Sequence, residues 1–288
     1  MKKTESSHSP SQQPRHFRAI WLSDLHLGSR DINSAALLDF LKRHKSDYLY
    51  LVGDIFDFWK VNNGWHWPEI NNQIVDLVLE RAENGTEVIY IPGNHDEMLR
   101  KYVHTEIKGV KILPEVLHRT ADGRRFLILH GDRFDLVTTY NRWLAKLGSE
   151  AYQVLLRLNR YHDFCRSKLG LGHWSLSAFC KHQVKVVVNF IGDFKQEIAQ
   201  EARRRQVDGL ICGHIHHASY ETIDEIIYTN TGDWVESCTA LVEDKDGKLI
   251  IFRWRDEPEI LVDERAFNSG AMEAYADCYR NRGLAPTS

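Results

Sequence analysis

Short apolar runs alternate with amphipathic stretches along the first half of the chain. Four runs are almost wholly apolar and predict buried strands over residues 17–22, 48–52, 88–91 and 126–129. Residues 34–44 and 70–82 carry apolar side chains three and four positions apart, which predicts two helices. Because strands and helices alternate, this half of the sequence favours an α/β fold with parallel strands.

The pattern changes after residue 132. Residues 133–205 show mostly helical spacing, and glycines near 148 and 170 interrupt it. A strand is expected again at 210–212, followed by β-hairpins over 219–229 and 239–254. We therefore expect four parts: a tail (1–15), a core (16–132 and 206–256), a helical insertion (133–205) and a C-terminal extension (257–288).

Composition narrows the class of protein. The chain has 288 residues, of which 43% are hydrophobic and 27% are charged, as in ordinary globular proteins. Its five cysteines are widely spread without a CxxC pair, which predicts reduced thiols and a cytoplasmic location rather than a disulfide scaffold. The N-terminal segment lacks the apolar run of a signal peptide, and no run is long enough for a membrane span.

Charge is unevenly distributed. The net charge is −3, but residues 133–205 hold 13 Lys and Arg against 6 Asp and Glu, a net charge of +7. Two interpretations remain open for this basic segment. It is either a solvated helical face or a surface that meets anions such as phosphates, nucleic acid or acidic lipid head groups.

Aspartate, histidine or asparagine residues follow each of five expected strands. The segments read SDLHLG, GDIFDFW, GNHDE, HGD and GHIHH, and they contain Asp24, His26, Asp54, Asp57, Asn94, His95, Asp96, His130, Asp132, His214 and His216. In an open α/β sheet, ligands bind beyond the carboxyl ends of the strands. We therefore expect these side chains to converge in space although they are far apart in the sequence.

The residue types indicate a metal site. Imidazole and carboxylate together suit first-row cations such as Mn²⁺, Fe²⁺ and Zn²⁺. Residues two apart in an extended chain point to the same side, so Asp24 and His26 could reach one ion. His214 and His216 could do the same, or a turn could divide them between two ions. Glycines precede Asp54, Asn94 and His214, where they permit close backbone approach.

The five motifs D-x-H, G-D-x-x-D, G-N-H-D, H-G-D and G-H-x-H together resemble the calcineurin-like metallophosphoesterase superfamily. The resemblance implies two mixed β-sheets in a four-layer α/β/β/α sandwich with a helical cap insertion and a two-metal site. One metal would be held by Asp24, His26, Asp54 and His216. The other would be held by Asp54, Asn94, His130 and His214, so that Asp54 bridges two divalent ions, expected to be Mn²⁺ with Fe²⁺ or Zn²⁺ as alternatives.

Two metals of this kind clamp a phosphoryl group and acidify a water molecule that attacks phosphorus. His95 is expected to stabilise the developing charge or to protonate the leaving group, and Asp96 to orient His95. Asp57 has two open interpretations, a residue supporting the site or a helix N-cap.

The basic insertion between His130 and His214 resembles that of the UDP-2,3-diacylglucosamine diphosphatase branch, whose members release UMP during lipid A synthesis. That resemblance implies a lipid-linked nucleotide sugar as substrate and peripheral contact with the inner membrane face. Arg157 and Arg160 would then meet the pyrophosphate or the membrane surface. Apolar stripes in the insertion either line an acyl groove or pack between helices. Two interpretations are open for a tryptophan cluster: it forms the base of a pocket for a nucleotide base or acyl chain, or it anchors a surface loop. The cluster consists of Trp59, Trp65 and Trp67.

Two motifs depart from that branch. His95 stands where its better-known members carry Arg, and GHIHHA replaces their usual GHTHRP. A phosphatase or phosphodiesterase acting on phosphoproteins, nucleotides or nucleic acid is therefore an alternative. A non-catalytic scaffold is a third hypothesis, but such a protein would tolerate loss of a ligand, whereas every motif position is filled here.

Overall fold

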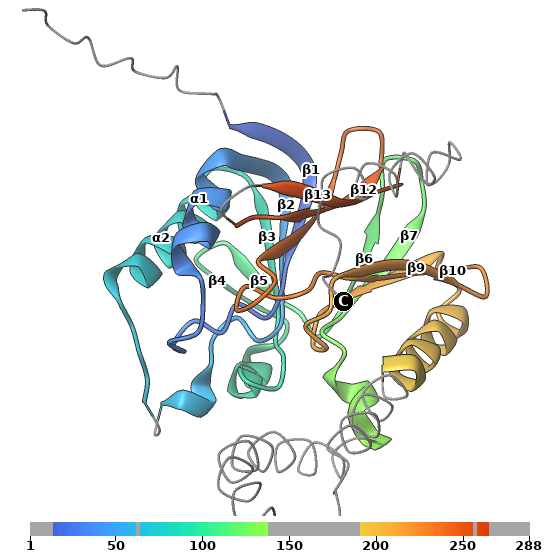
Figure 1. The fold of residues 1–288 in the computed structure, drawn as a ribbon, viewed down its shortest axis with the longest axis horizontal. Helices are drawn as coiled ribbons and strands as arrows, with labels where there is room; N and C mark the ends of the chain where they lie inside the picture. The colour runs from blue at the N-terminus through green and yellow to red at the C-terminus, as the bar shows by residue number, and fades with distance from the viewer. Residues whose placement is uncertain (1–13, 62–63, 138–190, 256–257, 265–288) are drawn as a thin grey trace, which may run out of the picture.

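The computed structural model describes residues 14–61, 64–137, 191–255 and 258–264, which form two β-sheets packed face to face (Figure 1). The larger sheet has eight strands in the order β13 (Glu259–Asp263), β12 (Leu249–Arg253), β11 (Thr239–Glu243), β1 (Arg15–Leu22), β2 (His44–Val52), β3 (Glu87–Ile91), β5 (Val110–Ile112) and β4 (Thr105–Ile107). The smaller sheet has five strands in the order β6 (Val116–Arg119), β7 (Arg125–Ile128), β8 (Gly209–Cys212), β10 (Ile226–Asn230) and β9 (Ser219–Ile223).

Both sheets are mixed. Strands β1, β2, β3 and β5 run parallel, and so do β7, β8 and β10. The remaining strands pair antiparallel at the edges. The central parallel strands β3, β7 and β8 read as largely apolar runs because both of their faces are mostly buried.

Successive side chains of one strand belong to different layers. Along β1, Trp21 faces the space between the two sheets, whereas Ile20 and Leu22 face the outer side of the larger sheet. The inner layer is completed by residues such as Ile91 and Phe126 from the two facing sheets. This alternation follows from the two-residue period of a strand.

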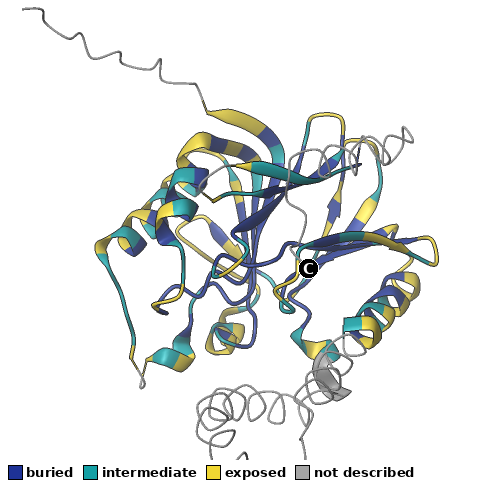
Figure 2. Ribbon diagram, viewed as in Figure 1, coloured by how far each residue is buried: buried dark blue, intermediate teal, exposed yellow. Residues whose placement is uncertain are grey.

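Helices cover the outer face of each sheet. On the larger sheet lie α1 (Ser34–Arg43) and α2 (Glu69–Glu83), as Figure 1 shows. Residues 191–204 form a helix over the outer face of the smaller sheet, and Ile198 packs there with Leu210 and Tyr228. The burial pattern of Figure 2 follows these layers, with buried strands between half-exposed helices. The four-layer α/β/β/α arrangement is therefore confirmed for the described residues.

The ends of α1 show why the helix lies where the sequence predicts it. The Asn33 side chain accepts a hydrogen bond from the Ala36 amide at 3.2 Å, as an N-cap residue does. Lys42 and Arg43 lie in the last turn, where positive charge is favourable. The chain then becomes extended at His44 and begins β2 directly.

Three boundaries differ from the predicted ones. The 191–204 helix was assigned to the insertion, but its apolar stripe packs on the core sheet. The C-terminal extension was expected from residue 257, but Glu259–Asp263 pairs with β12 as an edge strand. The N-terminal tail was expected to end at residue 15, where β1 already begins. Residues 138–190 of the insertion, which include Arg157 and Arg160, and most of the extension lie outside the described residues.

Candidate metal centre

The loops that follow five strands are tied to one another by hydrogen bonds. The amide of Asp24, after β1, donates to the carbonyl of Gly53, after β2, at 3.1 Å. The amide of His214, after β8, donates to the Asp24 carboxylate at 2.9 Å and thereby joins the two sheets. The strand ends therefore converge as the sequence predicts, and the motifs share one site.

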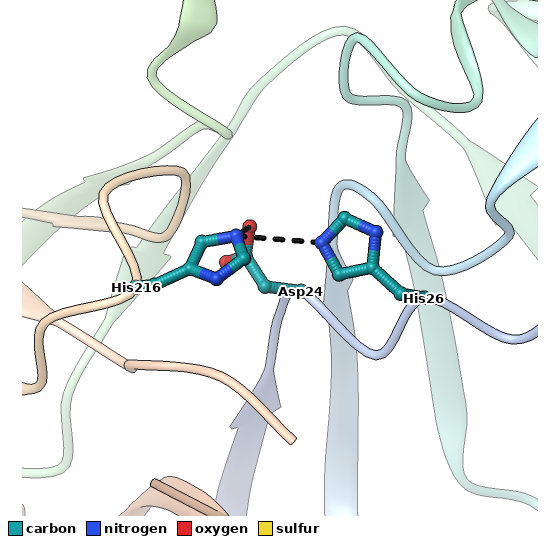
Figure 3. A group of neighbouring side chains, drawn as sticks. All are labelled: Asp24, His26 and His216. Atoms are coloured by element: carbon teal, nitrogen blue, oxygen red, sulfur yellow. Dashed lines mark hydrogen bonds and ion pairs between the residues drawn. The ribbon is translucent and has the colours of Figure 1, made fainter. Parts of the chain in front are cut away.

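The first cluster consists of Asp24, His26 and His216, whose candidate ligand atoms all lie within 4.8 Å of one another. His216 Nε2 is 3.2 Å from Asp24 Oδ1 and 3.3 Å from His26 Nε2 (Figure 3). The hydroxyl of Ser23 donates to the other Asp24 oxygen at 2.5 Å and helps to fix that carboxylate. Ser23 was not predicted, because a serine beside a motif carries no distinctive signal.

The second cluster consists of Asp54, His130 and His214, again with ligand atoms within 4.8 Å. His130 Nε2 is 3.3 Å from Asp54 Oδ2. The opposite ring nitrogen, Nδ1, donates to the carbonyl of Val52 at 3.0 Å, which leaves Nε2 free to act as a lone-pair donor. Three of the four residues in each set implied by the resemblance are thus brought together, and His214 and His216 are divided between the two clusters.

Buried polar atoms without hydrogen-bond partners indicate what the site can hold. Among the described residues, Asp24 Oδ1, His130 Nε2 and both polar atoms of the Asn94 amide are buried without such a partner. Leaving such atoms unsatisfied is costly in a folded protein. A carboxylate, an imidazole and an amide oxygen are all suitable ligands for a divalent cation, so these residues fit a metal site.

The backbone of the site is strained. Asp24, His26, Asp54, His214 and His216 all have left-handed φ angles, between 51° and 71°. Non-glycine residues rarely adopt this region, and such strain is concentrated at functional sites. The extended-chain argument for Asp24 and His26 is therefore wrong, since these residues reach one cluster from a left-handed turn and not from a strand.

Two glycines are required by close packing against the carboxylates. A side chain at Gly93 would place its Cβ 2.3 Å from Asp54 Oδ1, and one at Gly213 would come equally close to Asp24 Oδ2. Neither position tolerates a Cβ without displacing a candidate ligand. The predicted role of glycines beside ligands is confirmed here.

The electrostatics of both clusters favour positive charge. Burial alone would lower the pKa of His130, but the adjacent Asp54 carboxylate outweighs burial and raises that pKa to about 10. Burial likewise opposes protonation of His216, yet Asp24 raises its pKa to about 9. Burial disfavours ionised Asp24 as well, but the neighbouring imidazole of His216 holds its pKa below the ordinary value. In each cluster the carboxylate therefore favours positive charge on the adjacent imidazole.

His95 lies beside the first cluster, with its ring centroid 4.6 Å from that of His26. Its Nδ1 is 2.9 Å from Asp57 Oδ1, and since a carboxylate can only accept, Nδ1 donates. Its Nε2 lies 4.0 Å from Asp54 Oδ2. The Trp59 indole stacks on the imidazole with ring centroids 3.8 Å apart. The ring of His95 is thus held by Asp57 and Trp59.

Asp57, and not Asp96, supports the imidazole of His95. Asp57 makes no helix-capping bond and instead contacts both His95 and His26. Asp96 was expected to orient His95, and this expectation is wrong. Its carboxylate accepts from the amides of Gly93 at 2.6 Å and Ile55 at 2.8 Å, and from the hydroxyl of Tyr90. Asp96 therefore fixes the loop and not the imidazole.

The tryptophans separate into two groups. Trp65 stacks on Trp67 with centroids 5.2 Å apart, and Phe58 stacks on Trp65 in turn. The indole of Trp67 also donates to Asn72 at 2.7 Å, so these two tryptophans anchor the loop before α2. Trp59 differs because it contacts His95 and stays 46% exposed.

Paired carboxylates, imidazoles and an amide at the strand ends of two packed sheets define a metal-dependent phosphoester hydrolase. The model of the calcineurin-like phosphoesterase family matches residues 17–218, and the chain belongs to that family. Divalent metal ions are therefore implied at the two clusters.

Curated relatives are similar along most of the chain. The UDP-2,3-diacylglucosamine hydrolase of Psychromonas ingrahamii is 26% identical over 82% of this chain and 98% of its own. The protein of the same name from Vibrio cholerae is 27% identical over 80% and 96%. Among solved structures, the Escherichia coli phosphoesterase Yfce is 15% identical, with a TM-score of 0.45 over 85% of this chain and 97% of its own. No helix among the described residues could span a membrane.

Proposed function

We propose that this protein hydrolyses the pyrophosphate bond of UDP-2,3-diacylglucosamine and releases UMP and 2,3-diacylglucosamine 1-phosphate. The observation that carries the proposal is its similarity to UDP-2,3-diacylglucosamine hydrolases along 93–98% of their length. The basic segment between His130 and His214 supports it, because a substrate with phosphate and hydrocarbon parts suits a basic, partly apolar cap. A lipid substrate also favours a cytoplasmic enzyme in peripheral contact with a membrane.

In this proposal the two clusters hold the metals. Asp24, His26 and His216 form the first site and Asn94, His130 and His214 the second, with Asp54 shared between them. Mn²⁺ is the expected ion, because it accepts carboxylate, amide and imidazole ligands together. When bound, two such ions offset the negative charge of the phosphoryl group and acidify a water molecule.

His95 is proposed to supply the proton for the leaving phosphate. His95 Nδ1 donates a hydrogen bond to Asp57 and keeps its proton, so a second proton on the ring would sit at Nε2. That atom faces Asp54 and is the one from which a proton can pass to the leaving phosphate. Asp57 stabilises the protonated ring, and the Trp59 stack restricts its rotation. Asp96 acts by holding the loop that carries Asn94 and His95.

Three further residues are proposed to contact the substrate. The exposed part of Trp59 offers an aromatic surface for a base or an acyl chain. Arg157 and Arg160, in the basic insertion, would meet the pyrophosphate or the membrane surface.

The experiment compares UMP release from acylated and acyl-free UDP-glucosamine at matched concentrations. We expect preference for the acylated substrate, because each buried methylene contributes about 0.8 kcal/mol. Charge reversal at Arg157 and Arg160 should weaken that preference. Equal rates on both substrates, or turnover of phosphoproteins or oligonucleotides alone, would favour a different phosphoester substrate. His95 and the GHIHHA segment both differ from the usual motifs of the diacylglucosamine branch. For this reason a different phosphoester substrate is the alternative that the experiment must distinguish.

A further inference from the structure

A polar cleft opens beside the second metal cluster. It has a volume of about 440 Å³, and His130 and Gly131 form part of its wall. No residue of the first cluster is among the described residues that line it. The cleft is therefore a recess on the His130 side of the site, apart from Trp59 and His95. Its volume lies in the range of small-molecule sites.

Two arginines give the cleft its charge. Arg100, in the 3₁₀ helix η2 (Glu97–Tyr102), and Arg133, in the 3₁₀ helix η3 (Asp132–Val137), both line it. Arg100 Nη2 lies 2.5 Å from Asp132 Oδ2, and Arg133 Nη2 lies 2.6 Å from Glu115 Oε2. Each side chain stays 45% exposed, so donors remain for an anion. Guanidinium groups bind phosphate oxygens with two parallel hydrogen bonds.

Apart from the two arginines, Asp132 and two histidines, the wall is apolar. Pro92, Val103, Pro114 and Leu129 contribute to it, and the imidazole of His104 lies among them. A single phosphate would leave most of the volume unfilled and would not contact these side chains. An acyl chain would leave the two arginines facing hydrocarbon, which is unfavourable. A phosphate that carries a sugar and a base satisfies both kinds of wall.

We propose that this cleft, the arginine cleft, binds the nucleoside monophosphate half of the substrate, with Arg100 and Arg133 directed to its phosphate. The inference rests on the proposed function, since it assigns one half of that substrate to one side of the metal pair. The acylated half then extends toward Trp59. Neither arginine stands out in the sequence, because both lie outside the five motifs.

The test is the dissociation constant of UMP for the full-length, Mn²⁺-loaded protein, measured by equilibrium dialysis. Arg100→Gln and Arg133→Gln should each weaken UMP binding roughly tenfold, as expected for loss of a charged hydrogen bond. The metal content should stay unchanged. Wild-type protein should bind UMP more tightly than orthophosphate, because the cleft also contacts the nucleoside.

Two control variants separate ligand binding from loss of an ion pair. Arg43 is likewise exposed and paired with a carboxylate, but it lies on α1, so Arg43→Gln should leave UMP binding unchanged. Glu115→Gln removes the nearer ion-pair partner of Arg133 and keeps both the arginine and its longer contact with Glu201, so it should leave UMP binding intact or strengthen it. If Glu115→Gln weakens binding as much as Arg133→Gln does, the arginine acts through the fold and the inference fails.

The remaining outcomes distinguish this inference from the proposed function. Unchanged UMP affinity in both arginine variants, or equal affinity for UMP and orthophosphate, would overturn the arginine cleft. Such a result leaves the hydrolysis of the lipid-linked sugar intact if UMP is still released from it. Conversely, arginine-dependent UMP binding without turnover of the lipid-linked sugar supports the cleft and contradicts the proposed substrate.

Discussion

At the scale of single residues, the site combines strained backbone with buried, unsatisfied polar atoms. Left-handed φ angles at five candidate ligands cost on the order of 1–3 kcal/mol each, and the rest of the fold must offset that cost. His130 and Asn94 add buried atoms that lack hydrogen-bond partners in the described residues. Both features lower the stability of the metal-free protein, and they are expected at a site where a bound cation compensates for them.

Replacement of His95 separates proton transfer from metal binding. His95→Ala should lower the rate of hydrolysis by about 10²–10⁴-fold, because acid–base help is lost. The metal content should stay the same, since His95 is not one of the proposed ligands. Steady-state rates and elemental analysis on the same preparation check both statements. A variant that hydrolyses at the wild-type rate would show that His95 has no part in proton transfer.

Which carboxylate supports His95 could not be predicted from the sequence. Asp96 is adjacent to it in the chain, whereas Asp57 is 38 positions away. The turn after β3 directs Asp96 back toward the amides of Gly93 and Ile55, where it satisfies buried donors. The spacing G-D-x-x-D was the available signal for Asp57, but spacing does not specify the direction of a side chain.

At the scale of elements, the helix over residues 191–204 belongs to the core. Ile198 is fully buried against the smaller sheet, whereas Gln200 of the same helix is exposed. Ile198→Ala should lower the free energy of unfolding by about 2–5 kcal/mol, the usual range for a buried aliphatic side chain. Gln200→Ala is the matched control and should change it by less than about 0.5 kcal/mol. Equal effects in denaturant titrations would place this helix outside the core.

A second element, the junction of α1 and β2, makes stability depend on pH. His44 is buried there, its Nδ1 is 2.9 Å from the Phe40 carbonyl, and burial lowers its pKa. The unfolded chain therefore binds more protons than the folded one below the ordinary histidine pKa of about 6.5. The contribution of neutral His44 to the stability of the fold is fully present above about pH 6.5. It is lost as the pH falls toward the lowered pKa of His44 in the folded protein.

The corresponding variant is His44→Gln. We expect the difference in unfolding free energy between wild type and His44→Gln to shrink from pH 7.5 to pH 5.5, because only the wild type must keep a buried imidazole uncharged. Denaturant titrations of both proteins at the two pH values measure this difference in unfolding free energy. The contributions of other titrating groups cancel because they are the same in both proteins. A constant difference would mean that the protonation of His44 does not change on folding.

At the scale of the whole molecule, the predictability of an element followed its burial. Strands β1, β2, β3, β7 and β8 were predicted within a few residues because their apolar runs are buried on both faces. Strands β4, β5 and β6 were missed because exposed positions interrupt them and no continuous apolar run results. The edge strand β13 was missed because its side chains are only half-buried.

The proposed metal site would link the two sheets, since Asp24 and His26 follow a strand of one sheet and His216 follows a strand of the other. A ligand that binds only the folded state stabilises it, by about 4 kcal/mol at a thousand times its dissociation constant. Removing metal with a chelator should therefore lower the temperature of unfolding, and adding Mn²⁺ should restore it. An unfolding temperature that is insensitive to chelation would argue against metals joining the sheets.

The central claim is a two-metal centre at the strand ends, and the most direct measurement is the metal content of the purified, full-length protein. We predict about two equivalents of divalent ion in active wild-type protein. Asp54→Ala should lose most of both, because Asp54 lies against His130 and is proposed to bridge the two sites. Fully active protein without divalent metal, or Asp54→Ala protein that keeps both ions, would contradict the account.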